Sequence, residues 1–264
     1  MNQLLNLALG IYLAALVLAA VNLAVKRRWL GRVAEFVLMG GALALTAYIG
    51  RRWQASGRAP FSNMFESLVL MAWAVPVAYQ VAQSRLKAPW LTAPTALFAA
   101  LTLAYAGTYE ADIHPLMPAL RSNWLAVHVF TCFLGYAGLA VSFLAALGHL
   151  AAARPGSRTT AETRATLELT VTRSVTFGFL FLSVGIVTGA VWANAAWGTY
   201  WSWDPKETWA LVTWLVYAFF LHCRTLESWR GRRASWVAVL GFASVLFTYF
   251  GVNYLMSGLH SYAS

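Results

Sequence analysis

Long apolar runs, separated by short polar stretches, make up most of this 264-residue chain. A run of about 20 apolar residues is long enough for a helix that crosses the hydrocarbon core of a bilayer. The pattern predicts eight transmembrane helices, at residues 4–25, 33–50, 66–83, 90–109, 125–151, 174–194, 208–224 and 235–256. The expected fold class is therefore all-α, a polytopic membrane protein with a single integral membrane domain over residues 1–264.

The composition supports a membrane protein. Hydrophobic residues make up 60% of the chain and charged residues only 11%, whereas soluble domains carry about 25% charged residues. The net charge of +10 could suggest nucleic-acid binding, but that function needs basic residues gathered on one soluble face. Here they lie between apolar runs, so no nucleic-acid partner is expected and the lipid bilayer is the surrounding medium.

The basic residues also predict an orientation. With the N-terminus outside, 14 of the 19 Lys and Arg residues fall on the cytoplasmic side, in agreement with the positive-inside rule. Both termini and residues 197–209 then lie on the extracytoplasmic side. The first apolar run is expected to be a retained helix, because the basic cluster follows it, at residues 26–28. The polar stretch 154–173 is expected to lie on the anionic inner leaflet.

One segment is both highly aromatic and charged. It reads Trp197-Gly-Thr-Tyr-Trp-Ser-Trp-Asp-Pro-Lys-Glu-Thr-Trp209 and holds four of the 13 tryptophans. Asp204, Pro205 and Glu207 fit the N-cap, first and third positions of a helix, with the Glu207 carboxylate accepting from the cap's N–H. Trp209 is then one turn inside that helix. The upstream aromatic residues follow no helical or strand period, so they are expected to form a surface that suits a large planar ligand: Trp197, Tyr200, Trp201 and Trp203.

The histidines fall at two depths. His128 lies one turn below the outer interface and His260 follows the last helix on the same side, whereas His149 is about 31 Å further along the helix of His128. His222 is also at the inner end of its helix. Two outer imidazoles beside an aromatic platform suit haem, whose iron takes axial nitrogen ligands. An interfacial aromatic belt with two incidental histidines explains the same residues equally well.

An acidic residue also falls near the outer interface. Glu66 opens the third predicted helix, where an ionised carboxylate needs a partner. Arg58 and Arg121 are the candidate partners, and the alternative is that Glu66 helps to frame the outer site. A structural ion pair is favoured, because a single carboxylate with no second acid is a weak catalytic signal.

The tryptophan-rich segment resembles the "WWD" signature of the haem-handling proteins of cytochrome c biogenesis, the family of CcsA (also called ResC), CcmC and CcmF. Three flanking segments, at residues 61–67, 124–128 and 251–262, match CcsA best. The resemblance runs from about residue 58 to the C-terminus. Eight helices also fit CcsA, whereas CcmC has fewer and CcmF many more.

The resemblance implies a set of ligands. His128 and His260 resemble the two outer histidines that ligate haem, and His222 resembles the transmembrane histidine of an inner site through which haem passes. The second ligand of that inner site comes from a partner subunit, CcsB (ResB), with His149 as a lower-ranked rival. The other residues implied to contact the cofactor belong to the WWD loop, residues 197–209: Trp197, Trp201, Trp203, Asp204 and Trp209.

The implied function is to transport haem b and present it. With CcsB, the chain would attach haem to the Cys-X-X-Cys-His motif of apocytochrome c, as a subunit of a holocytochrome c synthase (haem lyase) of system II. It would supply no nucleophile of its own. Delivery of haem without ligation, as in CcmC, is the alternative, and a membrane electron-transfer cytochrome is a second rival that fits the histidine spacing poorly. The expected location is a bacterial-type cytoplasmic membrane or its thylakoid equivalent.

Overall fold

The computed structural model describes residues 2–86 and 88–256, and every regular element within these ranges is a helix. The helices form two compact units, Met1–Pro115 and Leu116–Ser264. Each unit has its own set of packed helices. The single membrane domain over the whole chain stays a prediction.

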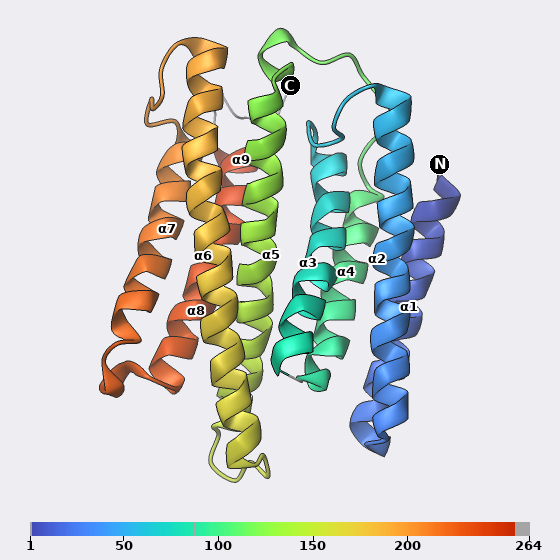
Figure 1. Ribbon diagram of the computed structural model, residues 1–264, viewed down its shortest axis with the longest axis vertical. Coiled ribbons are helices and arrows are strands. Elements are labelled where there is room, and N and C mark those ends of the chain that lie inside the picture. The colour runs from blue at the N-terminus through green and yellow to red at the C-terminus, as the bar shows by residue number, and fades with distance from the viewer. Residues whose placement is uncertain (1, 87, 257–264) are drawn as a thin grey trace. The chain divides into compact units, whose positions relative to one another are not determined.

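The first unit contains four helices: α1 (Asn2–Val25), α2 (Arg28–Ser56), α3 (Met64–Leu86) and α4 (Thr92–Ala106), the last preceded by a 3-10 turn at Pro89–Leu91 (Figure 1). Helix α1 packs against α2 and α4, and α3 packs against α4 and α2. Gly41 lets α2 approach the Tyr12 ring, since a Cβ there would lie 2.4 Å from the Tyr12 Cε1 atom. The Tyr12 hydroxyl donates to the Ala72 carbonyl at 2.9 Å, which ties α1 to α3.

The second unit contains α5 (Asn123–Ala152), α6 (Ala161–Trp197), α7 (Pro205–Cys223) and α8 (Arg232–Leu246), which continues through a π-helical turn (Phe247–Gly251) into α9 (Val252–Leu255). Helices α5 and α6 lie side by side with the most extensive contact of the unit (Figure 1). Glycines bring their backbones together: a Cβ on Gly135 would lie 2.9 Å from the Leu182 nitrogen, and one on Gly138 would lie 3.0 Å from the Gly178 nitrogen. Close backbone approach at small residues is the usual basis of helix packing in lipid.

All eight predicted helices are present, which confirms the all-α fold, but several boundaries differ. Helix α6 begins at Ala161, whereas the sequence pattern placed its start at residue 174. Residues 161–173 are therefore the first turns of a 37-residue helix, not a separate segment on the leaflet. At 1.5 Å per residue this helix is about 55 Å long, well beyond the roughly 30 Å of hydrocarbon. Helix α2 likewise continues to Ser56, so that Arg52 lies inside it.

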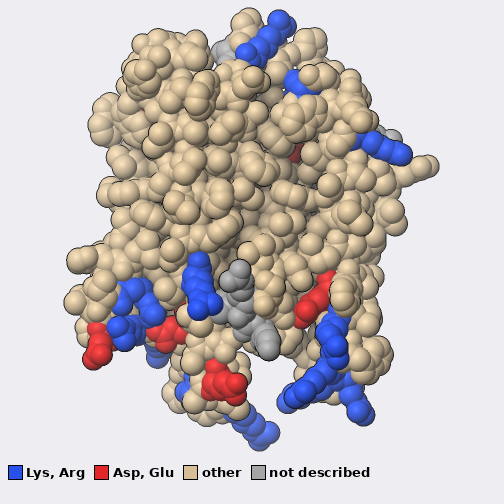
Figure 2. Space-filling model, in the orientation of Figure 1, with Lys and Arg blue, Asp and Glu red and all other residues tan. Residues whose placement is uncertain are grey.

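Six of the described helices are long and apolar enough to cross a membrane, which makes the chain a multi-pass membrane protein. The two others are α4, with 15 residues, and α7, with 19 residues and charged side chains in its first turn. A helix of 15 residues is about 22 Å long, somewhat shorter than the hydrocarbon core. Figure 2 shows that the Lys, Arg, Asp and Glu side chains on this face form separate patches, with large stretches of other residues between them.

Candidate functional site

His128 lies in the second turn of α5, and its Nδ1 atom is 2.7 Å from the Gly185 carbonyl oxygen of α6. A carbonyl oxygen can only accept a hydrogen bond, so Nδ1 carries the proton. The neutral ring then has its lone pair on Nε2. A hydrogen bond from the other ring nitrogen to a carbonyl is the usual arrangement of a histidine that ligates a metal.

Glycines on α6 make room for the His128 ring. A Cβ on Gly189 would lie 2.6 Å from both Nδ1 and Cε1 of His128, and one on Gly185 would lie 2.5 Å from the Cys132 sulfur. Gly185 and Gly189 are four residues apart and present one face of α6 to α5. Any larger residue at 189 would force the imidazole to move.

Aromatic contacts connect His128 to the tryptophan-rich segment. The Trp192 ring stacks on the His128 ring, with centroids 6.0 Å apart and an interplanar angle of 17°. Trp192 in turn meets Trp197 edge to face at 4.9 Å. Trp192 is only 3% exposed, and it was not among the predicted site residues. The structure therefore brings the His128 imidazole to the start of the WWD loop.

The WWD loop begins where α6 ends. Gly198 has φ 79° and its N–H donates to the Asn194 carbonyl at 3.0 Å, which closes the helix. Trp201 and Trp203 meet edge to face at 5.7 Å. Trp203 has φ 61°, a conformation that is strained for a bulky residue, and it is 68% exposed. Trp203 is thus exposed and Trp201 partly buried, and a flat surface shared by the aromatic residues of the loop stays a prediction.

The start of α7 has the predicted capping box. The Asp204 carboxylate accepts from the Lys206 N–H at 3.0 Å, and the Glu207 carboxylate accepts from the Asp204 N–H at 3.3 Å. Glu207 also accepts from the Ser202 N–H at 2.8 Å, which ties the loop to the helix. Trp209, one turn into α7, packs on Phe247 at 4.2 Å between ring centroids.

Lys206 joins the start of α7 to α9. Its ammonium donates to the Asn253 side-chain oxygen at 2.9 Å, while the Asn253 amide donates to the Tyr249 carbonyl at 2.7 Å. The end of the last helix is therefore beside the WWD loop. His260, the second predicted outer ligand, lies outside the described residues and follows Asn253 by seven positions.

The two inner histidines differ in accessibility. His149 is 5% exposed, and its Nδ1 atom is 2.9 Å from the Ser235 hydroxyl. His222, in the last turn of α7, is exposed. The buried face of α7 consists of other residues, Thr213, Tyr217, Phe220 and Cys223.

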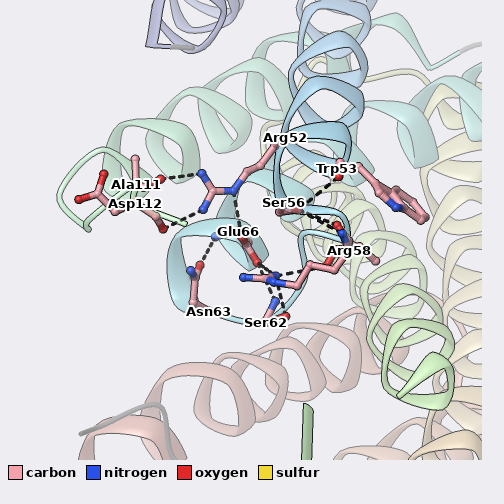
Figure 3. A network of polar contacts seen from close by, with 10 residues as sticks. Arg52, Trp53, Ser56, Arg58, Ser62, Asn63, Glu66, Ala111 and Asp112 are labelled. Atoms are coloured by element: carbon pink, nitrogen blue, oxygen red, sulfur yellow. Dashed lines mark hydrogen bonds and ion pairs between the residues drawn. The ribbon is translucent and has the colours of Figure 1, made fainter. Parts of the chain in front are cut away.

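The first unit has a buried ionic cluster of its own (Figure 3). Glu66 accepts from Arg52 Nε at 2.9 Å and from Arg58 Nη1 at 3.1 Å. The other two Arg52 nitrogens donate to the carbonyls of Ala111 and Asp112. The predicted pairing of Glu66 with Arg58 is present, whereas the fully buried Arg52 was not predicted as a partner. The cluster joins the end of α2, the start of α3 and the loop after α4.

The region that contains these residues also matches a known protein family. A family model for "Cytochrome C assembly protein" matches residues 61–260, a range that includes His128, the WWD loop and α7. The chain belongs to the cytochrome c assembly protein family. Its first residues, 1–60, lie outside the matched region.

Relatives within this family include the cytochrome c biogenesis protein CcsA of Synechococcus sp. (strain RCC307). That protein is 39% identical, and the match covers 97% of this chain and 93% of the relative. CcsA of Guillardia theta is also 39% identical, over 83% of this chain and 82% of the relative. The resemblance to CcsA is thereby confirmed.

A solved structure with a similar fold is that of the cytochrome c haem lyase CcmF. The TM-score is 0.71 at 22% sequence identity, and the match covers 98% of this chain but only 46% of the CcmF chain. This chain thus spans about half the length of CcmF. At this identity the likeness concerns the fold.

Proposed function

We propose that this protein binds haem b on the extracytoplasmic side of the membrane, between His128 and His260, and presents it to apocytochrome c. With a partner subunit of the CcsB (ResB) type, it attaches haem covalently to the Cys-X-X-Cys-His motif of that substrate. This function is in keeping with membership of the cytochrome c assembly family and with relatives named CcsA. CcmF, which shares the fold, is itself named a haem lyase.

The observation that carries the proposal is the setting of His128. Its Nδ1 proton is directed to the Gly185 carbonyl, so the lone pair of the neutral ring is on Nε2, as an iron ligand requires. Among the described residues, no three His, Cys, Asp or Glu side chains are placed so that they could hold a metal ion together. Haem iron does not need such a group, because the porphyrin supplies four nitrogens and the protein only the axial ligands.

The WWD loop supports binding of a flat, largely apolar macrocycle. His128, Trp192 and Trp197 are in consecutive ring contact where the loop begins, and Trp201 and Trp203 are in contact with each other further along it. Offset and edge-on aromatic contacts suit a porphyrin. The hydrogen bond between Lys206 and Asn253 supports the approach of the C-terminal segment that carries His260 to this loop.

The same proposal includes an inner site at His222. An exposed imidazole on a membrane helix is costly unless another group uses it, and exposure leaves it accessible to a second protein chain. The partner subunit then contributes the other axial ligand. The buried setting of His149 makes it the weaker candidate.

The attachment step needs positioning and no nucleophile from this chain. Each cysteine thiol of the substrate motif adds across one vinyl group of haem: a C–S bond forms, hydrogen ends on the neighbouring carbon, and nothing leaves. The thiolate is the reactive form. This chain's residues hold the vinyl edge in register with the thiols, which is where the gain in rate arises. The histidine of the substrate motif then displaces one outer ligand.

Purification of His128→Ala and His260→Ala variants with the partner subunit tests the proposal. Both variants are expected to lose most of the bound haem and to stop converting apocytochrome c, measured as haem per protein and as thioether-linked product. His114→Ala is the matched control, because His114 is a loop histidine with a side chain 66% exposed. Retention of wild-type haem and product in both variants would refute the outer site. Haem transfer with no thioether product in the wild-type complex would indicate delivery alone.

A further inference from the structure

The carboxylate of Glu168 joins three parts of the second unit at its inner end. One oxygen, Oε1, accepts both from Arg224 Nη1 and from the Gly231 N–H, the latter at 3.0 Å. Glu168 is in the third turn of α6, Arg224 caps the C-terminus of α7, and Gly231 precedes the first residue of α8. The α7–α8 connection is thus attached to α6 at both of its ends by one atom.

The end of α7 that this carboxylate anchors is the end that carries His222. The His222 carbonyl accepts from the N–H groups of Arg224 and Thr225 and from the Thr225 hydroxyl at 2.7 Å. Its backbone is therefore bonded directly to the residue that pairs with Glu168. A shift of Arg224 would move the His222 backbone with it.

The far end of the connection is equally constrained. Gly231 has φ 72° and ψ −121°, a region open essentially to glycine alone. The Gly231 carbonyl accepts from the Ser235 hydroxyl at 3.2 Å, and that hydroxyl is 2.9 Å from Nδ1 of the buried His149. Helices α5, α6, α7 and α8 thus meet in one polar cluster.

One donor of this cluster has no partner among the described residues. The Nε atom of Arg224 is buried with no hydrogen-bond partner in the described part of the chain. A buried donor that lacks a partner costs on the order of 1–3 kcal/mol. The ion pair with Glu168 nevertheless holds the Arg224 guanidinium in this position, and with it the C-terminus of α7.

We propose that Glu168 is a positioning residue for His222. Through Arg224 and the Gly231 amide, Glu168 fixes the α7 terminus, so that the exposed imidazole of His222 can share an iron with a ligand from another chain. The inference rests on the proposed function, because it takes His222 as the inner haem ligand. An isolated imidazole on a free helix end would have to be ordered when iron binds. The ionic cluster orders it beforehand.

The test uses the full chain co-purified with its partner subunit, in a His128→Ala background that removes the outer haem. Glu168→Gln is expected to reduce the low-spin inner haem about tenfold, the loss typical of a disturbed supporting residue at a metal site. Added imidazole, followed by removal of unbound haem, is expected to restore the low-spin absorption spectrum of the complex, because a folded inner site retains the haem. Glu168→Asp, which keeps the charge, is expected to retain more haem than Glu168→Gln. Glu162→Gln, an exposed glutamate in the first turn of α6, is the matched control.

Three outcomes distinguish the positioning role of Glu168 from the inner haem site itself and from a purely structural role. Equal inner haem in Glu168→Gln and Glu162→Gln, with loss in His222→Ala, would overturn the positioning role and leave the inner site intact. Retention of inner haem in His222→Ala would refute the inner site itself. Loss of protein yield in Glu168→Gln, with no recovery by imidazole and with equal loss in Glu168→Asp, would show a purely structural role and also overturn the proposal.

Discussion

Removing the Glu66 carboxylate should strongly destabilise the first unit. Glu66 and Arg52 are 2% and 1% exposed, and the two Glu66 oxygens accept from Arg52, Arg58 and the Ser62 N–H. In Glu66→Ala the Arg52 guanidinium keeps its bonds to two backbone carbonyls but stays buried without its carboxylate partner (Figure 3). Breaking a buried ion pair in this way costs about 3–5 kcal/mol.

That cost corresponds to a fall in the thermal unfolding midpoint on the order of 10 °C. Tryptophan fluorescence of the purified full chain during heating measures it. Glu110→Gln is the matched control, because the Glu110 side chain is 86% exposed. Raising the salt concentration should leave the difference largely unchanged, since buried pairs are poorly screened. A midpoint in Glu66→Ala within 1–2 °C of the control, roughly the effect of an exposed substitution, would refute the reasoning.

Three further predictions concern the second unit. Gly189→Ala should displace the His128 ring, because its Cβ would lie 2.6 Å from the His128 Nδ1 atom, and haem content in the purified complex should fall. Gly10→Ala is the control and should keep the haem content, because a Cβ there would have nothing within 4 Å. Trp203→Gly should relieve backbone strain and raise stability by about 1 kcal/mol while lowering product formation; lower stability with unchanged activity would contradict this. Asp204→Ala should cost about 1 kcal/mol through loss of the α7 cap, seen as a lower unfolding midpoint and absent in Asp204→Asn, which keeps a capping oxygen.

Features encoded in a few adjacent residues could be predicted from the sequence. The start of α7 is one, because the Asp204 and Glu207 carboxylates accept from nearby backbone N–H groups and Pro205 has no N–H that needs a partner, and the capping box is present as expected. The helices themselves follow from the length of their apolar runs. In both cases the determining interactions are between neighbours in the chain.

Features that depend on contacts between distant residues were missed. The start of α6 was placed 13 residues too late, because the polar residues of its first turns obscured a helix that is continuous with the apolar run. The burial of Arg52 depends on carbonyls 59 and 60 residues away, which no local pattern reveals. The Gly185-x-x-x-Gly189 spacing was a usable signal for the close approach of α6 to α5, and it would have indicated the partner of His128.

The proposed function depends above all on ligation of haem iron by His128 through Nε2. The most direct measurement is the absorption spectrum of haem bound to a His128→Gly variant, purified with the partner subunit, before and after addition of imidazole. We expect the low-spin spectrum of the outer haem to be lost in this variant and to return when imidazole fills the space of the missing ring. A low-spin spectrum of full intensity before any imidazole is added would contradict it.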